Sequence, residues 1–228
     1  MGRPFAAVIA LAWLSAQPLA PRAGKASDKS LFRLPEAVSV SDVEIPTLSI
    51  ANGTVVLDVR ISEQGEVEDI QVRRDIASET EEAVRSVKTW KFEPAKSNGK
   101  AATSRMTVAV TFNPPSPLGA EVPLPPLREQ DDEDRIKAVF QPPEVARATF
   151  PISPYTAFAP GTAIFEVSIN EAGKATSSKV LRDAPPFTTP ALQAIEHWEF
   201  LPATLSGKPV KAKVVLVFCF RLPIGSWH

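Results

Sequence analysis

The sequence predicts an α+β protein built from two tandem β-β-α-β modules, each a three-stranded antiparallel sheet with one helix on one face. The first observation is an internal repeat: residues 32–112 recur without a gap as residues 140–220, so that Gly53 matches Gly161 and Trp90 matches Trp198. Solenoid units are only about 20–50 residues long, so a longer period indicates two copies of a small domain. The second observation is that both copies show the same order of strand and helix patterns.

The first two strands of each module form a predicted hairpin. Residues 55–61 alternate apolar and polar side chains, and residues 163–169 do the same in the second repeat. This period of two is typical of a half-buried strand. Turn residues follow at 62–65 and 170–173, and a returning strand is expected after each, with an irregularity near Glu68–Asp69.

A helix is expected next, over Ser78–Thr89 and over Pro190–His197. Apolar residues recur at helical spacing in both segments. Ser78 and Glu81 have the spacing of a capping box. In the second repeat Thr189 is the expected N-cap and Pro190 the first helical residue, where a missing N–H costs nothing.

Each helix runs into a Trp-x-Phe-x-Pro-Ala block, which starts at Trp90 and at Trp198. Side chains two apart in an extended chain point the same way, so these aromatic pairs are expected to close the helix onto the sheet as core residues. A Gly-Lys turn follows, and then a last strand, expected at Thr103–Phe112 and at Lys211–Phe220.

The spacing of Gly-x-Val, Gly-x-Val, Ala-Val-x-x-Val-x-x-Trp-Lys-Phe-x-Pro-Ala and Asn-Gly-Lys in residues 53–100 resembles the C-terminal domain of TonB. That module belongs to periplasmic energy-transducing proteins of Gram-negative bacteria and to the related TolA-type domains. The resemblance covers residues 53–112 and 161–220, and the Trp-x-Phe-x-Pro-Ala block with its Gly-Lys turn occurs in both.

The resemblance implies that the last strand of each module accepts a short peptide by strand addition, as TonB accepts the TonB box of an outer-membrane transporter. An edge strand presents unpaired N–H and C=O groups, which agrees with this role. The implied partner is an outer-membrane or other envelope protein. The candidate peptide-binding residues are Thr103, Arg105, Thr107, Ala109, Thr111, Lys211, Lys213, Val215, Val217 and Cys219. The alternative is a structural or assembly protein whose repeats pair with each other or with a second chain, for example in a homodimer.

The outward faces of the two last strands differ. In the first repeat the outward set is polar or small: Arg105, Thr107, Ala109 and Thr111. In the second repeat it is apolar: Val215, Val217 and Cys219. A strand that is apolar on both faces is normally covered on both faces. We therefore expect the first repeat, the linker or a partner chain to cover this face.

The expected domain organisation has four parts. Residues 1–26 carry Arg3 and a short apolar stretch followed by small residues, which is typical of a secretory signal peptide. Residues 27–112 form repeat 1, residues 113–139 a Pro-rich acidic linker and residues 140–228 repeat 2. This predicts a periplasmic protein. The alternative is an inner-membrane anchor, the one case in which the chain would contact the membrane.

Several function classes are excluded. The net charge is −1 and Lys and Arg are not clustered, which argues against nucleic-acid binding. No motif indicates a catalytic, metal or cofactor site, so the sequence predicts no enzyme and no cofactor. A dipeptide recurs as Arg74-Asp75 and Arg182-Asp183. It is interpreted as a local ion pair or cap, with a ligand contact as the alternative.

Overall fold

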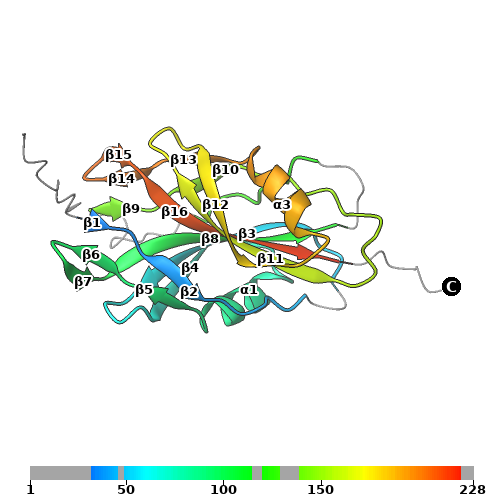
Figure 1. Cartoon of the computed structure of the whole chain (residues 1–228), viewed down its shortest axis with the longest axis horizontal. Helices are drawn as coiled ribbons and strands as arrows, with labels where there is room; N and C mark the ends of the chain where they lie inside the picture. The colour runs from blue at the N-terminus through cyan, green and yellow to red at the C-terminus, as the bar shows by residue number, and fades with distance from the viewer. Residues whose placement is uncertain (1–31, 46–48, 115–119, 129–138, 222–228) are drawn as a thin grey trace, which may run out of the picture.

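The computed structural model describes residues 32–45, 49–114, 120–128 and 139–221 (Figure 1). Both repeats have the predicted β-β-α-β order, and the α+β fold class is confirmed. In repeat 1 the main elements are β3 (Gly53–Ile61), β4 (Val67–Arg74), α1 (Thr80–Val87) and β8 (Ser104–Asn113). In repeat 2 they are β11 (Gly161–Ile169), β12 (Ala175–Arg182), α3 (Thr188–Ile195) and β16 (Ala212–Phe220). The helices occupy equivalent positions, as the gapless repeat predicts.

Short strands that the sequence did not reveal surround these elements. In repeat 1 they are β1 (Phe32–Arg33), β2 (Glu36–Ser39), β5 (Lys91–Glu93), β6 (Ala95–Ser97) and β7 (Lys100–Ala102). In repeat 2 they are β9 (Phe140–Gln141), β10 (Glu144–Arg147), β13 (Glu199–Leu201), β14 (Ala203–Leu205) and β15 (Lys208–Val210). Each Trp-x-Phe block lies at a strand, β5 or β13, which pairs with β2 or β10. We call residues 36–45 strap 1 and the equivalent residues 144–153 strap 2.

The hairpin irregularity near Glu68–Asp69 is confirmed, because the register between β3 and β4 shifts between Arg60 and Ile61. The predicted helix caps are wrong. The N-caps are Glu79 and Phe187, and neither makes a side-chain cap hydrogen bond. Instead the hydroxyls of Thr80 and Thr188 accept the backbone N–H of the residue four positions earlier. A threonine inside the first turn therefore holds the chain entering each helix.

The two repeats do not keep separate sheets. Their main strands form one six-stranded sheet in the order β12-β11-β16-β8-β3-β4. The two last strands join at its centre, where residues 214–220 of β16 run parallel to residues 107–113 of β8. All other neighbours in this sheet are antiparallel. Each module thus contributes three antiparallel strands, as predicted, and the two sets join into a single sheet.

The register of this central pair places the helices on opposite faces of the sheet. Val214 lies opposite Thr107, whereas the residue equivalent to Thr107 in the repeat is Val215. A shift of one residue exchanges the two faces of a strand. The helix-facing side chains of one repeat therefore share a face with the outward side chains of the other. Figure 1 shows α3 above the sheet and α1 below it.

The cores of the two repeats are interleaved as a result. The cluster beneath α1 contains Val215, Val217 and Cys219 from β16, and the cluster beneath α3 contains Val56 and Ala109 from repeat 1. The apolar outward face of the second repeat is thus covered by the first repeat, which confirms that it would be buried. A substitution at this face affects the core of the other repeat.

Cys219 reports on this pairing, and we expect it to react very slowly with a thiol reagent in the native protein. Its side chain is fully buried, opposite Phe112. Burial raises the pKa of the Cys219 thiol from 9.0 to about 12, so the reactive thiolate is scarce. The stabilisation that comes from burying the neutral Cys219 thiol is therefore complete below about pH 9, where the thiol is also neutral in the unfolded chain. It is lost as the pH rises toward about 12, the raised pKa of Cys219 in the folded protein. Fast stoichiometric labelling of the folded monomer at pH 8, followed by mass spectrometry, would contradict the paired arrangement.

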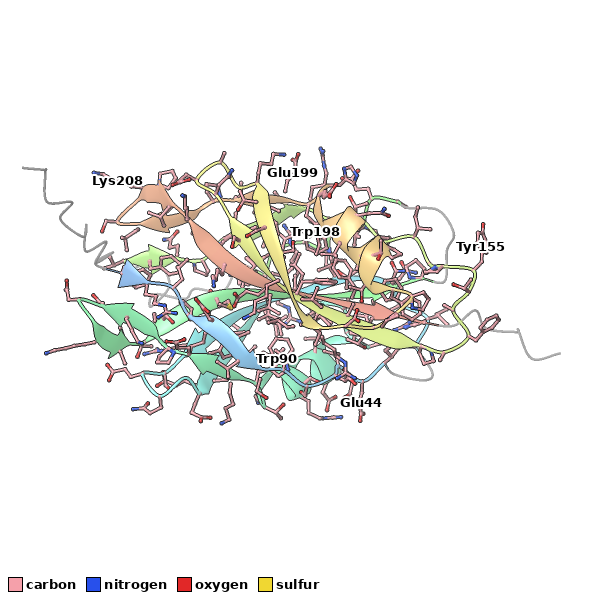
Figure 2. All side chains as sticks on the ribbon, viewed as in Figure 1. Glu44, Trp90, Tyr155, Trp198, Glu199 and Lys208 are labelled. Carbon is pink, nitrogen blue, oxygen red and sulfur yellow. The ribbon has the colours of Figure 1, made fainter. Side chains whose placement is uncertain are left out.

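The two tryptophans are core residues, as predicted from the Trp-x-Phe block. Trp90 and Trp198 are each 1% exposed, and Figure 2 places them on opposite sides of the sheet. The indole N–H of Trp90 donates to the carbonyl oxygen of Ser41, and that of Trp198 donates to the carbonyl oxygen of Thr149. Each tryptophan thereby attaches a strap to its own repeat.

Candidate protein-binding edges of the sheet

The strand edges that the resemblance implies are not open in the folded chain. Six of the candidate residues lie where β8 and β16 pair with each other: Thr107, Ala109, Thr111, Val215, Val217 and Cys219. They are buried. This corrects the expected accessibility of the last strands: each occupies the edge of the other, and a peptide reaches these residues only if the repeats separate.

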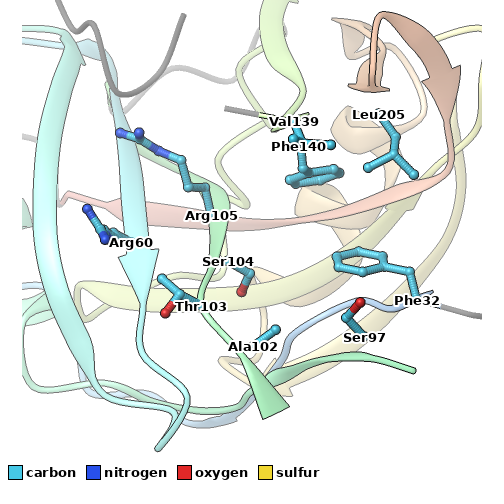
Figure 3. Close-up of a pocket in the computed structure, with 10 residues that line it drawn as sticks. All are labelled: Phe32, Arg60, Ser97, Ala102, Thr103, Ser104, Arg105, Val139, Phe140 and Leu205. Carbon is cyan, nitrogen blue, oxygen red and sulfur yellow. The ribbon is translucent and has the colours of Figure 1, made fainter. Parts of the chain in front are cut away.

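The other four candidate residues lie near the beginnings of the same strands. Thr103 and Arg105 line a cavity of about 520 Å³ between the repeats. Figure 3 shows the rings of Phe32 and Phe140 on one side of this cavity and Arg60 and Arg105 on the other. The two ring centroids are 5.8 Å apart. Arg105 is bound to the chain itself, because it pairs with Asp58 at 3.1 Å and donates to Gln71 at 2.7 Å.

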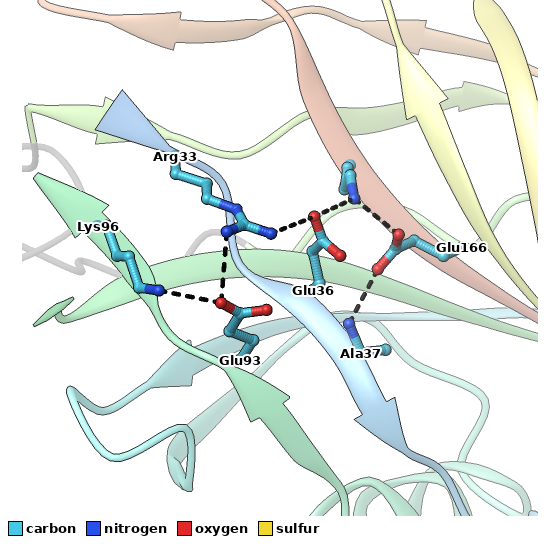
Figure 4. Close-up of polar contacts among 7 residues, drawn as sticks. Arg33, Glu36, Ala37, Glu93, Lys96 and Glu166 are labelled. Carbon is cyan, nitrogen blue, oxygen red and sulfur yellow. Dashed lines mark hydrogen bonds and ion pairs between the residues drawn. The ribbon is translucent and has the colours of Figure 1, made fainter. Parts of the chain in front are cut away.

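Lys213, equivalent to Arg105, belongs to an ion-pair network that joins the repeats, and Lys211 lies just before β16. The Lys213 Nζ lies 2.8 Å from Glu166 and 3.1 Å from Glu36 of strap 1. Glu166 also accepts the backbone N–H of Ala37 at 2.9 Å, as Figure 4 shows. Burial alone would lower the pKa of Lys213, but its hydrogen bonds to Glu166 and Glu36 outweigh burial and raise it. The hydrogen bond from Lys213 lowers the pKa of Glu36. These charges hold strap 1 on repeat 2.

A second ion pair joins the repeats at the opposite end of the central strands. Arg221, just after β16, pairs with the buried Glu79 at 2.6 Å and donates to the carbonyl oxygens of Ser49 and Ala51, each at 2.8 Å. Its guanidinium also lies 5.6 Å from the centroid of the Phe112 ring. Removing one partner would leave a buried charge without compensation, which is strongly destabilising. The two ion-pair groups therefore act against separation of β8 and β16.

The remaining edges of the six-stranded sheet are β4 and β12. The linker covers the end of β4: the Arg128 N–H donates to the carbonyl oxygen of Arg73 at 2.8 Å. The guanidinium of Arg74 donates to the carbonyl oxygen of Pro125. The described part of the linker is thus packed against the domain, and one edge of the sheet is partly closed by the chain itself.

The edge of β12 is open over the residues that the structure describes. Its backbone pairs with β11 on one side, and no other described segment donates to it or accepts from it through the backbone. Most of its side chains are exposed, including Val180 at 41%. Such an edge can pair with an extended segment of another chain.

The sequence did not predict β12 as a binding edge, because the family resemblance implies the last strand alone. In a three-stranded sheet with the order β12-β11-β16 the second strand of the repeat is also an edge. The available signal was its composition, since Ala175–Arg182 contains four Ser, Thr or Lys residues. Polar side chains on both faces are typical of a strand that is exposed on both faces.

Within the described residues, no group of three or more His, Cys, Asp or Glu side chains could hold a metal ion. The helices described here are all too short or too polar to cross a membrane.

A family model of the Gram-negative bacterial TonB protein C-terminal matches the chain twice, at residues 50–114 and 156–222. The two matches together cover more than half of the chain, and each covers most of one repeat. A search of curated proteins finds no match to the chain.

Proposed function

Since the chain belongs to the family of Gram-negative bacterial TonB C-terminal domains, we propose that it captures extended segments of envelope proteins by strand addition. Outer-membrane transporters are the partners that the family suggests first. The proposal places the protein in the periplasm as a non-enzymatic binding module. The signal peptide predicted at residues 1–26 lies outside the described residues.

The observation that supports this proposal is the open edge of β12. Strand addition needs a row of backbone N–H and C=O groups with no partner, and within the described part of the chain β12 has one over Ala175–Arg182. The last strands are less suitable, because capture there would break the parallel pairing and expose Val215, Val217 and Cys219 to water. We therefore assign the proposed capture to β12.

The alternative function is a structural or assembly role without peptide capture. The pairing of β8 with β16 favours it, because the repeats satisfy each other's edges. In that case β12 would pair with a second copy of the chain or stay unpaired. The two functions differ in what contacts β12 in the envelope.

Photocrosslinking from β12 tests the proposal. A benzophenone side chain at Ser178 should crosslink to an outer-membrane protein, and mass spectrometry should map the contact to an extended segment of it. A benzophenone at Glu171, in the hairpin turn before β12, is the matched control because this position is also exposed. Crosslinks at Ser178 that join only two copies of this chain would favour the assembly function.

Cys219 shows which edge is used. Capture at β12 leaves β8 and β16 paired, so labelling of Cys219 should stay slow when the partner is bound. Capture at the last strands must separate them and expose the thiol. Fast labelling of Cys219 on addition of the partner would contradict the assignment to β12.

A further inference from the structure

The repeated Arg-Asp dipeptide lies at the end of each outer strand, and in repeat 1 both of its residues hold the linker. The guanidinium of Arg74 donates to the carbonyl oxygen of Pro125, and Asp75 forms an ion pair with Arg128. The backbone N–H of Arg128 donates to the carbonyl oxygen of Arg73 at 2.8 Å. In repeat 1 the dipeptide thus contacts the linker of the same chain.

The linker in this position has the features of a bound peptide. Residues 120–128 read Ala-Glu-Val-Pro-Leu-Pro-Pro-Leu-Arg, a composition that favours extended chain. The Val122 N–H donates to the carbonyl oxygen of Ala148 at 2.9 Å, and the Phe150 N–H donates to the carbonyl oxygen of Ala120 at 2.8 Å. Val122 is buried against the core of repeat 2. The segment lies between strap 2 and the outer strand of repeat 1.

Repeat 2 carries the same parts at the end of β12. Leu181, Arg182 and Asp183 occupy the positions of Arg73, Arg74 and Asp75, and strap 1 takes the place of strap 2. Arg182 forms an ion pair with Asp42 of strap 1 at 2.5 Å, and Asp183 accepts a hydrogen bond from the Thr188 hydroxyl at 2.5 Å. Both are exposed. No described segment takes the place of the linker here.

We infer that Arg182 and Asp183 anchor an extended, proline-containing segment of another protein, with a basic residue three positions after the proline. This inference rests on the proposed capture at β12 and names the chemistry of the captured segment. By analogy with the linker, Arg182 donates to the carbonyl oxygen of the proline, and Asp183 pairs with the basic side chain. The carbonyl oxygen of Leu181 accepts the N–H of that basic residue.

The ion pair between Arg182 and Asp42 does not block this role. About 45% of the Arg182 side chain and 49% of the Asp42 side chain are exposed, and an exposed pair contributes little to stability. In repeat 1 the guanidinium of Arg74 donates to the strap, at the carbonyl oxygen of Val145, and to the linker at the same time. Arg182 has enough N–H donors to bind strap 1 and a captured segment at the same time.

Binding of a fluorescent synthetic peptide with the sequence of residues 120–128 to the full chain tests the inference. We expect saturable 1:1 binding, since the chain's own linker occupies the equivalent place in repeat 1. Asp183→Asn and Arg182→Gln should each weaken binding about tenfold or more, the effect of losing a hydrogen bond to a charged group. A peptide with glutamate in place of the arginine should bind as weakly.

The matched control is Glu171→Gln, which removes an exposed carboxylate from the hairpin turn before β12 and should leave the affinity of the peptide unchanged. Equal binding to the native chain and to Asp183→Asn, or no saturable binding, would overturn the inference. The proposed function would survive that result if the benzophenone at Ser178 still crosslinked to an extended segment of an envelope protein. If the peptide does not bind and the Ser178 crosslink is also absent, both the inference and the proposed function are wrong.

Discussion

We expect Val217→Asp to destabilise the whole protein, by roughly 4 kcal/mol or more, because it places a carboxylate in an apolar core. Val217 is 0% exposed, lies opposite Val110 on β8 and packs in the core beneath α1. The total stability of a domain is about 5–15 kcal/mol, so this one change removes much of it. Urea denaturation followed by tryptophan fluorescence measures the loss.

The same substitution at an exposed position of the same repeat is the control. Val180 lies on the open edge of β12, and Val180→Asp should change the free energy of unfolding by no more than about 0.5 kcal/mol. Similar effects of the two substitutions would mean that β16 is not buried between the repeats. The parallel pairing of the last strands would then be wrong.

The sequence predicted the main elements because their signals are local. The alternation in residues 55–61, the apolar spacing of Ala83 and Val87 and the Trp-x-Phe block each predict one element. The strap strands β2 and β10 have four residues each, and β1 and β9 just before them have two, too few to show a period. The strands β2 and β10 form because each Trp-x-Phe strand and each tryptophan N–H has a strap as its partner.

Long-range partners explain most of what the sequence did not show. The capping-box spacing predicts Ser78 as the N-cap, whereas the N-cap is Glu79, whose carboxylate pairs with Arg221, 142 residues away. The apolar outward face of β16 indicated a covering surface but not which one. Its cover is the first repeat, through a register shifted by one residue from the repeat itself. No local pattern encodes such a shift.

The candidate site shows the same contrast between local signals, which the sequence reveals, and long-range partners, which it does not. The edges carried over from the family are the last strands, and in a chain with one repeat they would be open. Here the second repeat supplies the strand that fills them. The Arg-Asp dipeptide was visible as a repeat, but its contact with the linker depends on where residues 120–128 run. The sequence alone therefore left a ligand contact as an alternative.

Truncating either tryptophan should destabilise the protein almost as much as Val217→Asp does. We expect Trp90→Ala or Trp198→Ala to lower the free energy of unfolding by roughly 3–5 kcal/mol. Trp198 contacts the ring of Phe218 edge-on at 5.7 Å and lies 6.1 Å from that of Phe200. Its N–H donates to the carbonyl oxygen of Thr149 at 3.1 Å. Trp198→Phe, which keeps a ring in the core, should cost less than Trp198→Ala. An unchanged denaturation midpoint would mean that the indole is exposed and available for recognition.

The two alanine variants together test whether the repeats fold as one unit. Trp90 belongs to the core beneath α1 and Trp198 to the core beneath α3, and each core contains side chains from both repeats. Loss of either core should therefore unfold the other. We expect one transition in each variant, with the midpoint lowered in both and no step that leaves half of the protein folded. Two transitions, of which only one moves in each variant, would show that the repeats are independent and that their last strands separate readily.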